Sequence, residues 1–489
     1  MREQVGADLV DPTGAAPGVV VTGLSLSSQR ISPGDLYAAL PGARVHGATY
    51  AADAVAAGAV AVLTDAAGAR TAADVGVPVL VAADPRSALG ALAALVYGDP
   101  AGSLTLMAVT GTQGKTTTTR LLDAGLERAG ITSAVVGTVG TRIAGADVKT
   151  SLTTPEAPDL HALFAVMREA QVRACAMEVS SHALVMGRVD GVVFDVAAFA
   201  NLGRDHLDFH ADLEDYFAAK ASLFTPERTR LGLTNVDDEF GRRLLDVAGV
   251  PMRTFSPSGA EADWRAVDVD LRPEGSRFTV VAPDGTRIAA GVPLTGAFNV
   301  ANALCAVALA AEAGFDPVAV AAGIIASDGV PGRLERIDAG QEFLAVVDYA
   351  HKPDALEAAL AALRPLTTGR LLLVLGAGGD RDSGKRPLMG EIGARLADVF
   401  VVTDDNPRSE DPAAIRAAIL DGVPDDPAAE VLEVGDRHEA IRRAIALAGP
   451  GDTVLVAGKG HETGQEIASV VHPFDDRDEV RAALAGVGS

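Results

Sequence analysis

The sequence contains little cysteine, few aromatic residues and a deficit of positive charge. Its 489 residues include two cysteines, Cys175 and Cys305, one tryptophan and only 4% aromatic residues. The cysteines lie far apart in apolar segments, so we expect buried thiols rather than a disulfide or a metal site. A reducing compartment, the cytoplasm, is therefore favoured. Apolar residues make up 48% of the chain, which is enough for several cores.

Acidic residues outnumber basic ones by 65 to 41, and the formal net charge is −24 at pH 7. Nucleic acid and anionic membrane surfaces are not expected as general partners, because both require a basic surface. No apolar run approaches the ~18 residues needed to cross a bilayer, and the N-terminus has no basic-then-apolar signal pattern. We expect no membrane insertion, and the length predicts two to four domains.

What the sequence does contain is a phosphate-binding loop. Residues 108–119 read Ala-Val-Thr-Gly-Thr-Gln-Gly-Lys-Thr-Thr-Thr-Thr. Gly111 and Gly114 allow successive backbone N–H groups to curl around phosphate oxygens, Lys115 reaches the terminal phosphates, and the hydroxyl of Thr116 can bind Mg²⁺. ATP is the expected ligand.

The flanks of this loop support the interpretation. We predict a strand over residues 104–109 and a helix over residues 117–130, which is the context that a phosphate loop requires. In the usual G-x-x-x-x-G-K spacing the early glycine would fall on Val109, and this departure narrows the family. A simple turn between a strand and a helix is the alternative.

Gly/Pro-rich segments at 98–102 and 329–332 divide the chain into three predicted α/β domains, at 1–98, 99–332 and 333–489. Strands and helices alternate in each, which predicts a central parallel sheet of the P-loop type and a Rossmann-like C-terminal domain. The predicted strands are Val19–Leu24, Ala59–Thr64, Val77–Val81, Ala174–Val179, Val192–Ala200, Leu231–Asn235, Phe343–Tyr349, Leu371–Leu375, Val399–Val402 and Thr453–Val456. Residues 264–295 alternate in β fashion and predict an antiparallel insert.

Three further residues are candidates for catalysis. Glu178 ends a predicted strand and is placed to bind a phosphate-bound Mg²⁺, although the following Ser-Ser could simply cap a helix. His206 follows another strand and is a metal or phosphate candidate, with an ordinary loop histidine as the alternative. Lys220 lies in an apolar helix where a cation meets a burial penalty, unless its end reaches the surface.

The chain resembles the Mur ligases, the ATP-dependent amide-forming family of peptidoglycan assembly. The similarity covers nearly the whole sequence and rests on motifs that occur in the family's order. They are Thr110-Gly-Thr-Gln-Gly-Lys-Thr-Thr, Thr153-Thr-Pro-Glu156, Glu178-Val-Ser-Ser-His182, Asn201-Leu-Gly-Arg-Asp-His-Leu-Asp208, Phe298-Asn-Val-Ala-Asn302, Pro331-Gly-Arg333, Asp348-Tyr-Ala-His351, Gly379-Asp-Arg-Asp382, Asp405-Asn-Pro-Arg408 and Gly458-Lys-Gly-His-Glu462.

The resemblance implies a cytoplasmic enzyme that adds meso-diaminopimelate to UDP-N-acetylmuramoyl-L-alanyl-D-glutamate through an acyl phosphate, using ATP and Mg²⁺. It further implies that Thr116 and Glu178 hold one Mg²⁺, and that His206 and a carbamylated Lys220 serve a second. A carbamate would replace the buried cation by an anion and remove the burial penalty. Lys115, Glu178, His206, Lys220, Arg333 and Asp348 are the catalytic residues that it implies.

The same resemblance assigns the two nucleotide-bearing substrates. For ATP it implies Thr110, Gly111, Thr112, Gln113, Gly114, Lys115, Thr116, Asn299, Asn302 and Arg333. For the muramoyl dipeptide it implies Ser28, Thr153, Thr154, Ser180 and Arg188. Two departures stand out: Ser27-Ser28-Gln29 replaces a frequent Asp-Ser-Arg, and Met186 stands where glutamine is frequent.

The motif Asp405-Asn406-Pro407-Arg408 decides the expected amino acid. Arg408 can grip a carboxylate bidentately and Asp405 can pair with an ammonium, and meso-diaminopimelate offers both at the end remote from the reacting amine. Lysine lacks that carboxylate and would leave Arg408 unpaired. Arg386, Gly458 and Glu462 match other residues of this site. Without the resemblance, Asn-Pro-Arg would be an ordinary Asx turn.

Other functional classes are less consistent with the sequence. A lysine-adding ligase or a folylpolyglutamate-synthase-like ligase of the same fold is the nearest alternative. A P-loop regulatory GTPase or transport ATPase would hydrolyse its nucleotide without an amine substrate. The GTPase is disfavoured because no Asn-Lys-x-Asp base-reading motif is present. A catalytically silent scaffold is disfavoured because each phosphate and metal position of the pattern is filled. The expected partners are small-molecule substrates, and we expect a monomer.

Overall fold

The computed structural model describes residues 1, 6–11, 14, 16–207 and 209–487. The chain forms two compact units. The first comprises Met1–Ser256, Ala260–Trp264 and Cys305–Val320, and the second comprises Pro257–Gly259, Arg265–Leu304 and Ala321–Ser489.

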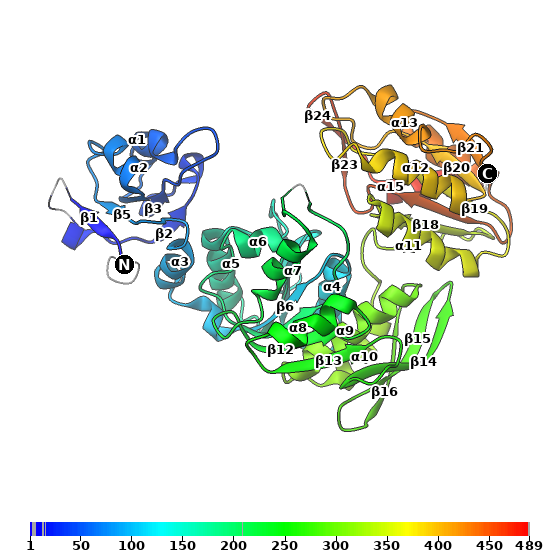
Figure 1. Ribbon diagram of the computed structural model, residues 1–489, viewed down its shortest axis with the longest axis horizontal. Helices are drawn as coiled ribbons and strands as arrows, with labels where there is room; N and C mark the ends of the chain where they lie inside the picture. The colour runs from blue at the N-terminus through cyan, green and yellow to red at the C-terminus, as the bar shows by residue number, and fades with distance from the viewer. Residues whose placement is uncertain (2–5, 12–13, 15, 208, 488–489) are drawn as a thin grey trace. The chain divides into compact units, whose positions relative to one another are not determined.

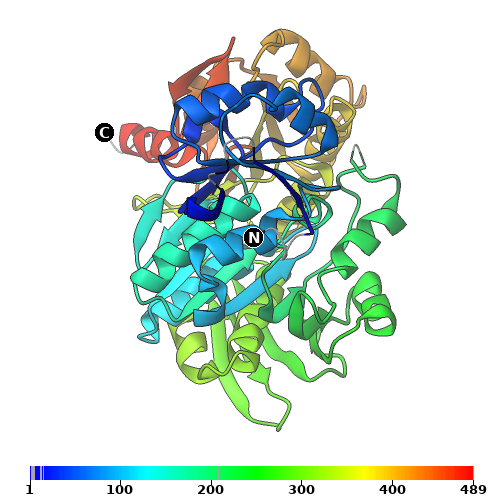
Figure 2. The same ribbon diagram turned by 90° about the vertical axis from the view of Figure 1, so that its left-hand side faces the viewer.

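The first unit begins with a small sheet in the order β1-β5-β4-β3-β2. Its strands are β1 (Asp8–Val10), β2 (Gly23–Ser25), β3 (Asp35–Ala38), β4 (Ala61–Thr64) and β5 (Val79–Val81), parallel except for β1. The helices α1 (Ala51–Ala56), α2 (Ala66–Thr71) and α3 (Leu89–Tyr97) pack against it (Figures 1 and 2, blue). The βαβ prediction is confirmed for this region.

Side chains on the two faces of this small sheet enter different cores, as strand alternation requires. Leu36 and Leu63 pack with α3, whereas Tyr37 and Val62 pack with α1. The strand predicted at Val19–Leu24 was placed too early. The backbone becomes extended in a sheet only at Gly23, and Val20 is exposed, so its apolar side chain contributes to neither core.

A mainly parallel sheet carries the phosphate loop. In this unit the strands run in the order β13-β12-β11-β6-β10-β7-β8-β9. They are β6 (Thr105–Thr110), β7 (Ser133–Gly137), β8 (Gly140–Ile143), β9 (Ala146–Val148), β10 (Ala174–Glu178), β11 (Phe194–Phe199), β12 (Thr229–Asn235) and β13 (Met252–Ser256). Helices α4 (Lys115–Arg128), α5 (Ala157–Glu169), α6 (Ser181–Val185), α7 (Leu213–Ala221) and α8 (Glu239–Val247) accompany them.

The central strands are apolar almost throughout, as expected for strands covered on both faces. Every residue of β10 is buried, and so are five of the six residues of β6. The register pairs Glu178 with Val109 and Phe199 with Thr110. The carboxyl ends of these three strands therefore meet at one edge, where a doubly wound sheet places its ligand.

The second unit contains the predicted antiparallel insert, confirmed as β14 (Trp264–Arg272), β15 (Gly275–Val281) and β16 (Arg287–Val292). Gly275 and Gly285 have φ values of 143° and 84°, as the predicted turns require. Helices α9 (Ala297–Glu312) and α10 (Pro317–Ile325) follow along the chain, and of these two helices the residues within Cys305–Val320 belong to the first unit.

The remainder of the second unit is a sheet in the order β17-β18-β22-β19-β20-β21, parallel except for β17 (Figure 1, yellow to red). Its strands are β17 (Glu335–Ile337), β18 (Leu344–Asp348), β19 (Leu371–Leu375), β20 (Val399–Val402), β21 (Glu430–Glu433) and β22 (Thr453–Ala457). The helices are α11 (Pro353–Leu363), α12 (Lys385–Leu396), α13 (Pro412–Leu420), α14 (Arg437–Leu447) and α15 (Asp476–Val487). A hairpin of β23 (Gly464–Ile467) and β24 (Val470–Pro473) was not predicted.

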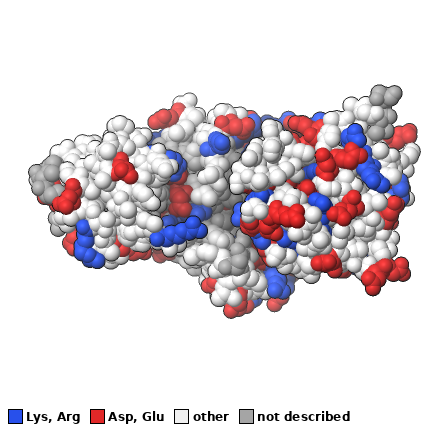
Figure 3. Space-filling view, turned by 90° about the horizontal axis from the view of Figure 1, so that it is seen from above, with Lys and Arg blue, Asp and Glu red and all other residues white. Residues whose placement is uncertain are grey.

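The α/β fold class predicted from the sequence is confirmed, whereas the domain boundaries after residues 98 and 332 stay a prediction. No helix within the described part of the chain is long and apolar enough to cross a membrane. On the face drawn in Figure 3, basic side chains are interspersed with acidic ones rather than gathered into one patch.

Candidate functional site

The phosphate loop leaves β6 through glycines that the backbone requires. Gly111 has a φ of 153°, and a Cβ built there would come within 3.1 Å of Ala200 and 3.2 Å of the Asn201 backbone. Gly114 has a φ of 86° and caps α4, whose first residue is Lys115. The helix dipole makes this N-terminus favourable for a bound anion such as a phosphate.

Asn201 fixes the shape of the loop. Its carbonyl accepts from the N–H of Thr112 at 3.0 Å, and its side-chain Oδ1 accepts from the N–H of Gln113 at 2.9 Å. The Asn201 amide in turn donates to the carbonyl of Gln113 at 3.2 Å. Asn201, two residues after the end of β11, therefore holds the loop after β6, and two of the recognised motifs are in direct contact.

Two lysines converge on the same carbonyl of the loop. Lys115 Nζ donates to the oxygens of Gly111 and Thr112 at 2.7 and 3.1 Å, and Lys220 Nζ donates to Gly111 at 2.8 Å. Lys220 is only 1% exposed, and its Nζ lies 4.6 Å from the ring centre of Tyr216. The surface interpretation of Lys220 is therefore wrong, and its ammonium is buried beside the phosphate loop.

The Glu178 carboxylate contacts the first turn of α4. Its Oε2 accepts from the hydroxyls of Thr116 at 3.0 Å and Thr138 at 3.1 Å, and its Oε1 accepts from the N–H of Thr138 at 2.8 Å. A Cβ at Gly137 would lie 2.2 Å from Oε1, so this close approach requires glycine. Sequence reasoning did not identify Thr138, although Gly137-Thr138 directly after an apolar run was an available signal.

The oxygen donors at this point suit Mg²⁺, which prefers carboxylate, hydroxyl and phosphate oxygens. Thr116 and Glu178 already lie within hydrogen-bonding distance of each other. Among the residues that the structure describes, no group of three or more His, Cys, Asp or Glu could hold a metal ion by itself. A metal at this place would therefore complete its ligand shell with phosphate oxygens or water.

His206 belongs to a cluster of aromatic rings. It has a φ of 54°, its Nε2 lies 3.3 Å from the Asp205 carboxylate, and its ring centre lies 4.7 Å from that of His182. Phe209 stacks on His182 at 4.0 Å. The metal role predicted for His206 stays a prediction, and Asp208 of the same motif lies outside the described residues.

His210 was missed by sequence reasoning. Its side chain is 1% exposed, Nε2 lies 3.0 Å from the Ser181 hydroxyl and Nδ1 lies 3.1 Å from the Asp215 carboxylate. It thus ties α7 to the start of α6. The second histidine in His206-x-x-x-His210 was the available signal.

Four of the predicted dipeptide-binding residues gather beside Glu178. The Thr154 hydroxyl donates to the Glu178 carbonyl at 2.8 Å and accepts from the N–H of Ser180 at 3.3 Å. Arg188 donates to the Thr154 carbonyl at 3.4 Å, and the hydroxyl of Thr153 lies 3.1 Å from that of Thr138. Ser180 also caps α6, so the capping alternative is correct for that hydroxyl.

Ser28 lies apart from these residues in sequence, on a 3₁₀ turn of the small N-terminal sheet. The turn covers Ser28–Arg30, and Ser28 is partly exposed. The Ser25 hydroxyl, which donates to the Ser27 carbonyl at 3.0 Å and accepts from the Ser27 N–H at 3.1 Å, shapes the loop before it.

In the second unit, the predicted nucleotide residues form two pairs. On α9, Asn302 donates to Asn299 at 3.1 Å, and Asn299 donates to the carbonyl of Thr295 at 2.8 Å. The second pair joins Arg333, which precedes β17, to the loop after β18: the Arg333 guanidinium lies 4.8 Å from the ring centre of Tyr349. Asp348 accepts from the backbone N–H groups of two loop residues. Burial raises its pKa, and the charge of Arg333 opposes that rise.

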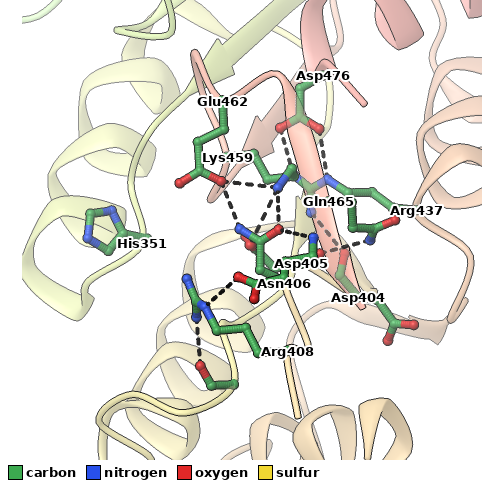
Figure 4. Close-up of polar contacts among 12 residues, drawn as sticks. His351, Asp404, Asp405, Asn406, Arg408, Arg437, Lys459, Glu462, Gln465 and Asp476 are labelled. Carbon is green, nitrogen blue, oxygen red and sulfur yellow. Dashed lines mark hydrogen bonds and ion pairs between the residues drawn. The ribbon is translucent and has the colours of Figure 1, made fainter. Parts of the chain in front are cut away.

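Figure 4 shows the loops at the carboxyl ends of β20 and β22, where the predicted amino-acid residues meet. Lys459 is fully buried and donates to Asn406 Oδ1 at 2.9 Å and to Glu462 at 3.1 Å, and it lies 3.9 Å from Asp405. The Asn406 amide donates to Glu462 at 2.8 Å. Gly458, at a φ of 115°, would bring a Cβ within 2.5 Å of Asp405. Lys459, between two recognised glycines, was not identified from the sequence.

The two predicted arginines of this site differ in their surroundings. Arg386 is buried and forms two hydrogen bonds of 2.9 Å with Glu410, a bidentate ion pair. Arg408, at a φ of 54°, donates to the carbonyl of Gly379 at 2.6 Å and lies 3.3 Å from the Glu466 carboxylate. Arg386 is held in place by its partner, whereas Arg408 is 23% exposed and more loosely paired.

His351 gives a testable pH dependence. Burial lowers its pKa to about 4, helped by the positive charges of Lys352 and Lys385, and its Nδ1 donates to the Tyr349 carbonyl at 2.7 Å. Between pH 6.5 and 4 the unfolded chain binds the proton more strongly, so this residue lowers stability as pH falls through that window. Between pH 7.5 and pH 5, the free energy of unfolding of His351→Gln, measured in urea, should fall by about 1–2 kcal/mol less than that of wild type. Equal losses would contradict a buried neutral imidazole.

Comparisons with known proteins agree with the geometry. Family models match in sequence order: "Mur ligase family, catalytic domain" over residues 20–97, "Mur ligase middle domain" over 109–310 and "Mur ligase, glutamate ligase domain" over 332–460.

Relatives are similar over the whole chain. A Streptomyces avermitilis protein named UDP-N-acetylmuramoyl-L-alanyl-D-glutamate--2,6-diaminopimelate ligase is 57% identical, with 98% of this chain and 96% of that protein covered. A Corynebacterium glutamicum protein of the same name is 51% identical, with 97% and 93% covered. A solved structure described by that name superposes with a TM-score of 0.69 at 34% identity and covers 98% of each chain.

Proposed function

Because this chain belongs to the Mur ligase family, we propose that it is an ATP-dependent ligase that joins meso-diaminopimelate to UDP-N-acetylmuramoyl-L-alanyl-D-glutamate. The substrates come from the names of relatives that are 51–57% identical over nearly the full length. The product would be a peptidoglycan precursor.

The proposed reaction activates a carboxylate before an amide forms. A carboxylate oxygen of the D-glutamyl residue attacks the γ-phosphorus of ATP, the bond to the β-phosphate oxygen breaks, and ADP leaves. The amine nitrogen then attacks the acyl carbon, and phosphate departs with the bond electrons while the nitrogen loses a proton. Both steps bring negative groups together, so cations contribute strongly to the rate.

The phosphate loop is proposed to bind the transferred group. The positive end of the α4 dipole lies at this loop, and Lys115 can exchange its carbonyl partners for phosphate oxygens. Thr116 and Glu178 would hold Mg²⁺, which supplies charge neutralisation when bound. The family resemblance adds His206 and Lys220, the latter as a carbamate, for a second metal.

The remaining residues would orient the substrates. Thr153, Thr154, Ser180 and Arg188 surround the carboxyl end of β10 and would hold the dipeptide, with Ser28 assigned to the uridine end. The residues that we assign to the nucleotide and to closure of the reacting site are Asn299, Asn302, Arg333 and Asp348.

One observation carries the choice of amino acid. Asp405 and Arg408, an anion and a cation, lie on one loop after β20, and buried Lys459 fixes the intervening Asn406. This arrangement is complementary to an ammonium and a carboxylate on one carbon. Lysine would leave Arg408 without its proposed ligand, which favours diaminopimelate over the lysine-adding alternative.

Purified protein should release phosphate from ATP only when the muramoyl dipeptide and an amino acid are both present. We expect kcat/KM for meso-diaminopimelate to exceed that for lysine by at least about tenfold, because lysine lacks the carboxylate that would bind Arg408 and hydrogen bonds to charged groups contribute about 1.5–3 kcal/mol. Turnover with lysine that equals or exceeds turnover with diaminopimelate would overturn the specificity. Phosphate release without an amine would instead point to a regulatory NTPase.

The proposal also includes three domains with boundaries after residues 98 and 332, a cytoplasmic location and a monomer. The monomer is tested by sedimentation equilibrium across a concentration series.

A further inference from the structure

The hairpin β23–β24 is fastened to the loop that carries Arg408. The N–H of Arg408 donates to the carbonyl of Glu466 at 2.9 Å, and the N–H of Ala468 donates to the carbonyl of Arg408 at 2.7 Å. The N–H of Glu466 also donates to Asn406 Oδ1 at 2.9 Å, and the Gln465 amide donates to the carbonyl of Asp405 at 2.8 Å. These contacts pair Arg408 with Ile467 in a parallel bridge and place Glu466 next to Arg408. In them Glu466 uses its backbone and not its carboxylate.

The side chains of Glu466 and Arg408 then form an ion pair, with 3.3 Å between Nε and Oε2. The Arg408 side chain is 23% exposed and the Glu466 side chain is 37% exposed. One guanidinium nitrogen, Nη1, is held by the carbonyl of Gly379, and within the described residues Nη2 makes no hydrogen bond. Partly exposed pairs of this kind are weak and exchange readily.

Arg386 provides the contrast within the same site. Glu410 binds it through two parallel hydrogen bonds of 2.9 Å, and its guanidinium is 5% exposed. Removing one partner of such a pair leaves a buried charge unsatisfied, so Glu410 is a structural brace. Glu466 makes only the looser contact and keeps its backbone hydrogen bonds whatever its side chain does.

We propose that Glu466 is a specificity-determining residue that competes with the substrate's remote carboxylate for Arg408. This inference rests on the proposed role of Arg408. Diaminopimelate must displace the Glu466 carboxylate from Arg408, and the loss of this ion pair weakens binding. Lysine has no such carboxylate and leaves the Arg408–Glu466 pair intact. Glu466 therefore narrows the difference in affinity between the two amino acids.

The test replaces Glu466 by glutamine, which keeps the size and the backbone contacts but removes the charge. Steady-state assays of Glu466→Gln should show a KM for meso-diaminopimelate lowered by about two- to tenfold, with kcat and the KM for ATP unchanged. The KM for lysine should stay the same or rise. The matched control is Glu391→Gln, which removes a similarly exposed partner of Arg395 on α12 and should change none of these constants.

The direction in which the KM for diaminopimelate changes shows whether Glu466 competes with the substrate for Arg408 or holds Arg408 in place. A KM for diaminopimelate that is unchanged or raised in Glu466→Gln would overturn the proposal, because a brace for Arg408 would weaken binding when removed. Glu410→Gln is the comparison: it removes a group that holds Arg386 in place, and it should raise the KM for diaminopimelate.

A double-mutant cycle separates this proposal from the role of Arg408. Arg408→Ala should raise the KM for diaminopimelate, and Glu466→Gln should have no further effect in that background. If Arg408→Ala leaves this KM unchanged, the role assigned to Arg408 fails. If Arg408→Ala raises it but Glu466→Gln still acts in its absence, only the competition fails.

Discussion

Replacing Lys220 with alanine is expected to lower turnover by about 10²–10³-fold, the loss typical of removing one electrostatic group from a reacting site. Lys220 is buried, and its Nζ shares the Gly111 carbonyl with Lys115. Because Lys115 still donates to that carbonyl in the variant, the loop keeps a hydrogen-bond partner there. The fold should therefore survive, as circular dichroism and thermal unfolding would check.

The response to small molecules identifies what Lys220 supplies. A carbamate forms when the neutral amine attacks CO₂ and loses a proton, so intact-mass measurement at high bicarbonate should find one added CO₂ in wild type and none in Lys220→Ala. Bicarbonate should not restore the variant, whereas acetate or formate should restore part of its turnover. The exposed Lys149, as Lys149→Ala, is the matched control and should keep full activity. Wild-type turnover in Lys220→Ala would rule out the carbamate role.

Replacing Arg437 with methionine should lower the free energy of unfolding by about 3–5 kcal/mol, because it leaves a buried carboxylate unpaired. Arg437 and Asp476 are both fully buried, and two hydrogen bonds of 2.7 Å join them. Arg437 also donates to the carbonyl of Ala457, the last residue of β22, and to that of Asp404 in the loop after β20. Figure 4 shows Arg437 between Asp476 and Asp404. The loss of stability should therefore extend to the loops of the amino-acid site.

Urea unfolding of three variants tests this account. Arg437→Met combined with Asp476→Leu should recover much of the loss, since an apolar pair replaces the unpaired charge. Arg395→Met removes an arginine with two exposed acidic partners on the surface and should cost about 0–1 kcal/mol. A cost for Arg437→Met as small as that of Arg395→Met would show that the buried pair contributes little.

Local patterns account for the parts of the site that the sequence predicted. The phosphate loop is contiguous, and its glycines and lysine act through their own backbone and through neighbours within four residues. Glu178 was predicted because strand ends gather at one edge of a parallel sheet, and the register of β6 and β10 places it there. Lys220 was singled out because an apolar helix makes a cation conspicuous.

Residues that act through distant partners could not be predicted in this way. Thr138 meets Glu178 across 40 positions of the chain, and Lys459 meets Asn406 across 53. The local sequence marks each of them only weakly, because Thr138 follows Gly137 after an apolar run and Lys459 lies between two glycines, and neither pattern names the distant partner. The hairpin that presents Glu466 was missed because its strands of four residues, one of them exposed throughout, carry little of the burial pattern that marks a strand.

The sequence by itself determined the α/β class, the phosphate loop and the residue types at each strand end, because periodicity and turn chemistry act over a few neighbouring residues. Only the tertiary structure decided which charges are paired. It buried Lys220 against Gly111, tied Arg386 to Glu410 and set Glu466 against Arg408. Coulomb interactions depend on distance and burial rather than on position along the chain, so only the folded structure determines them.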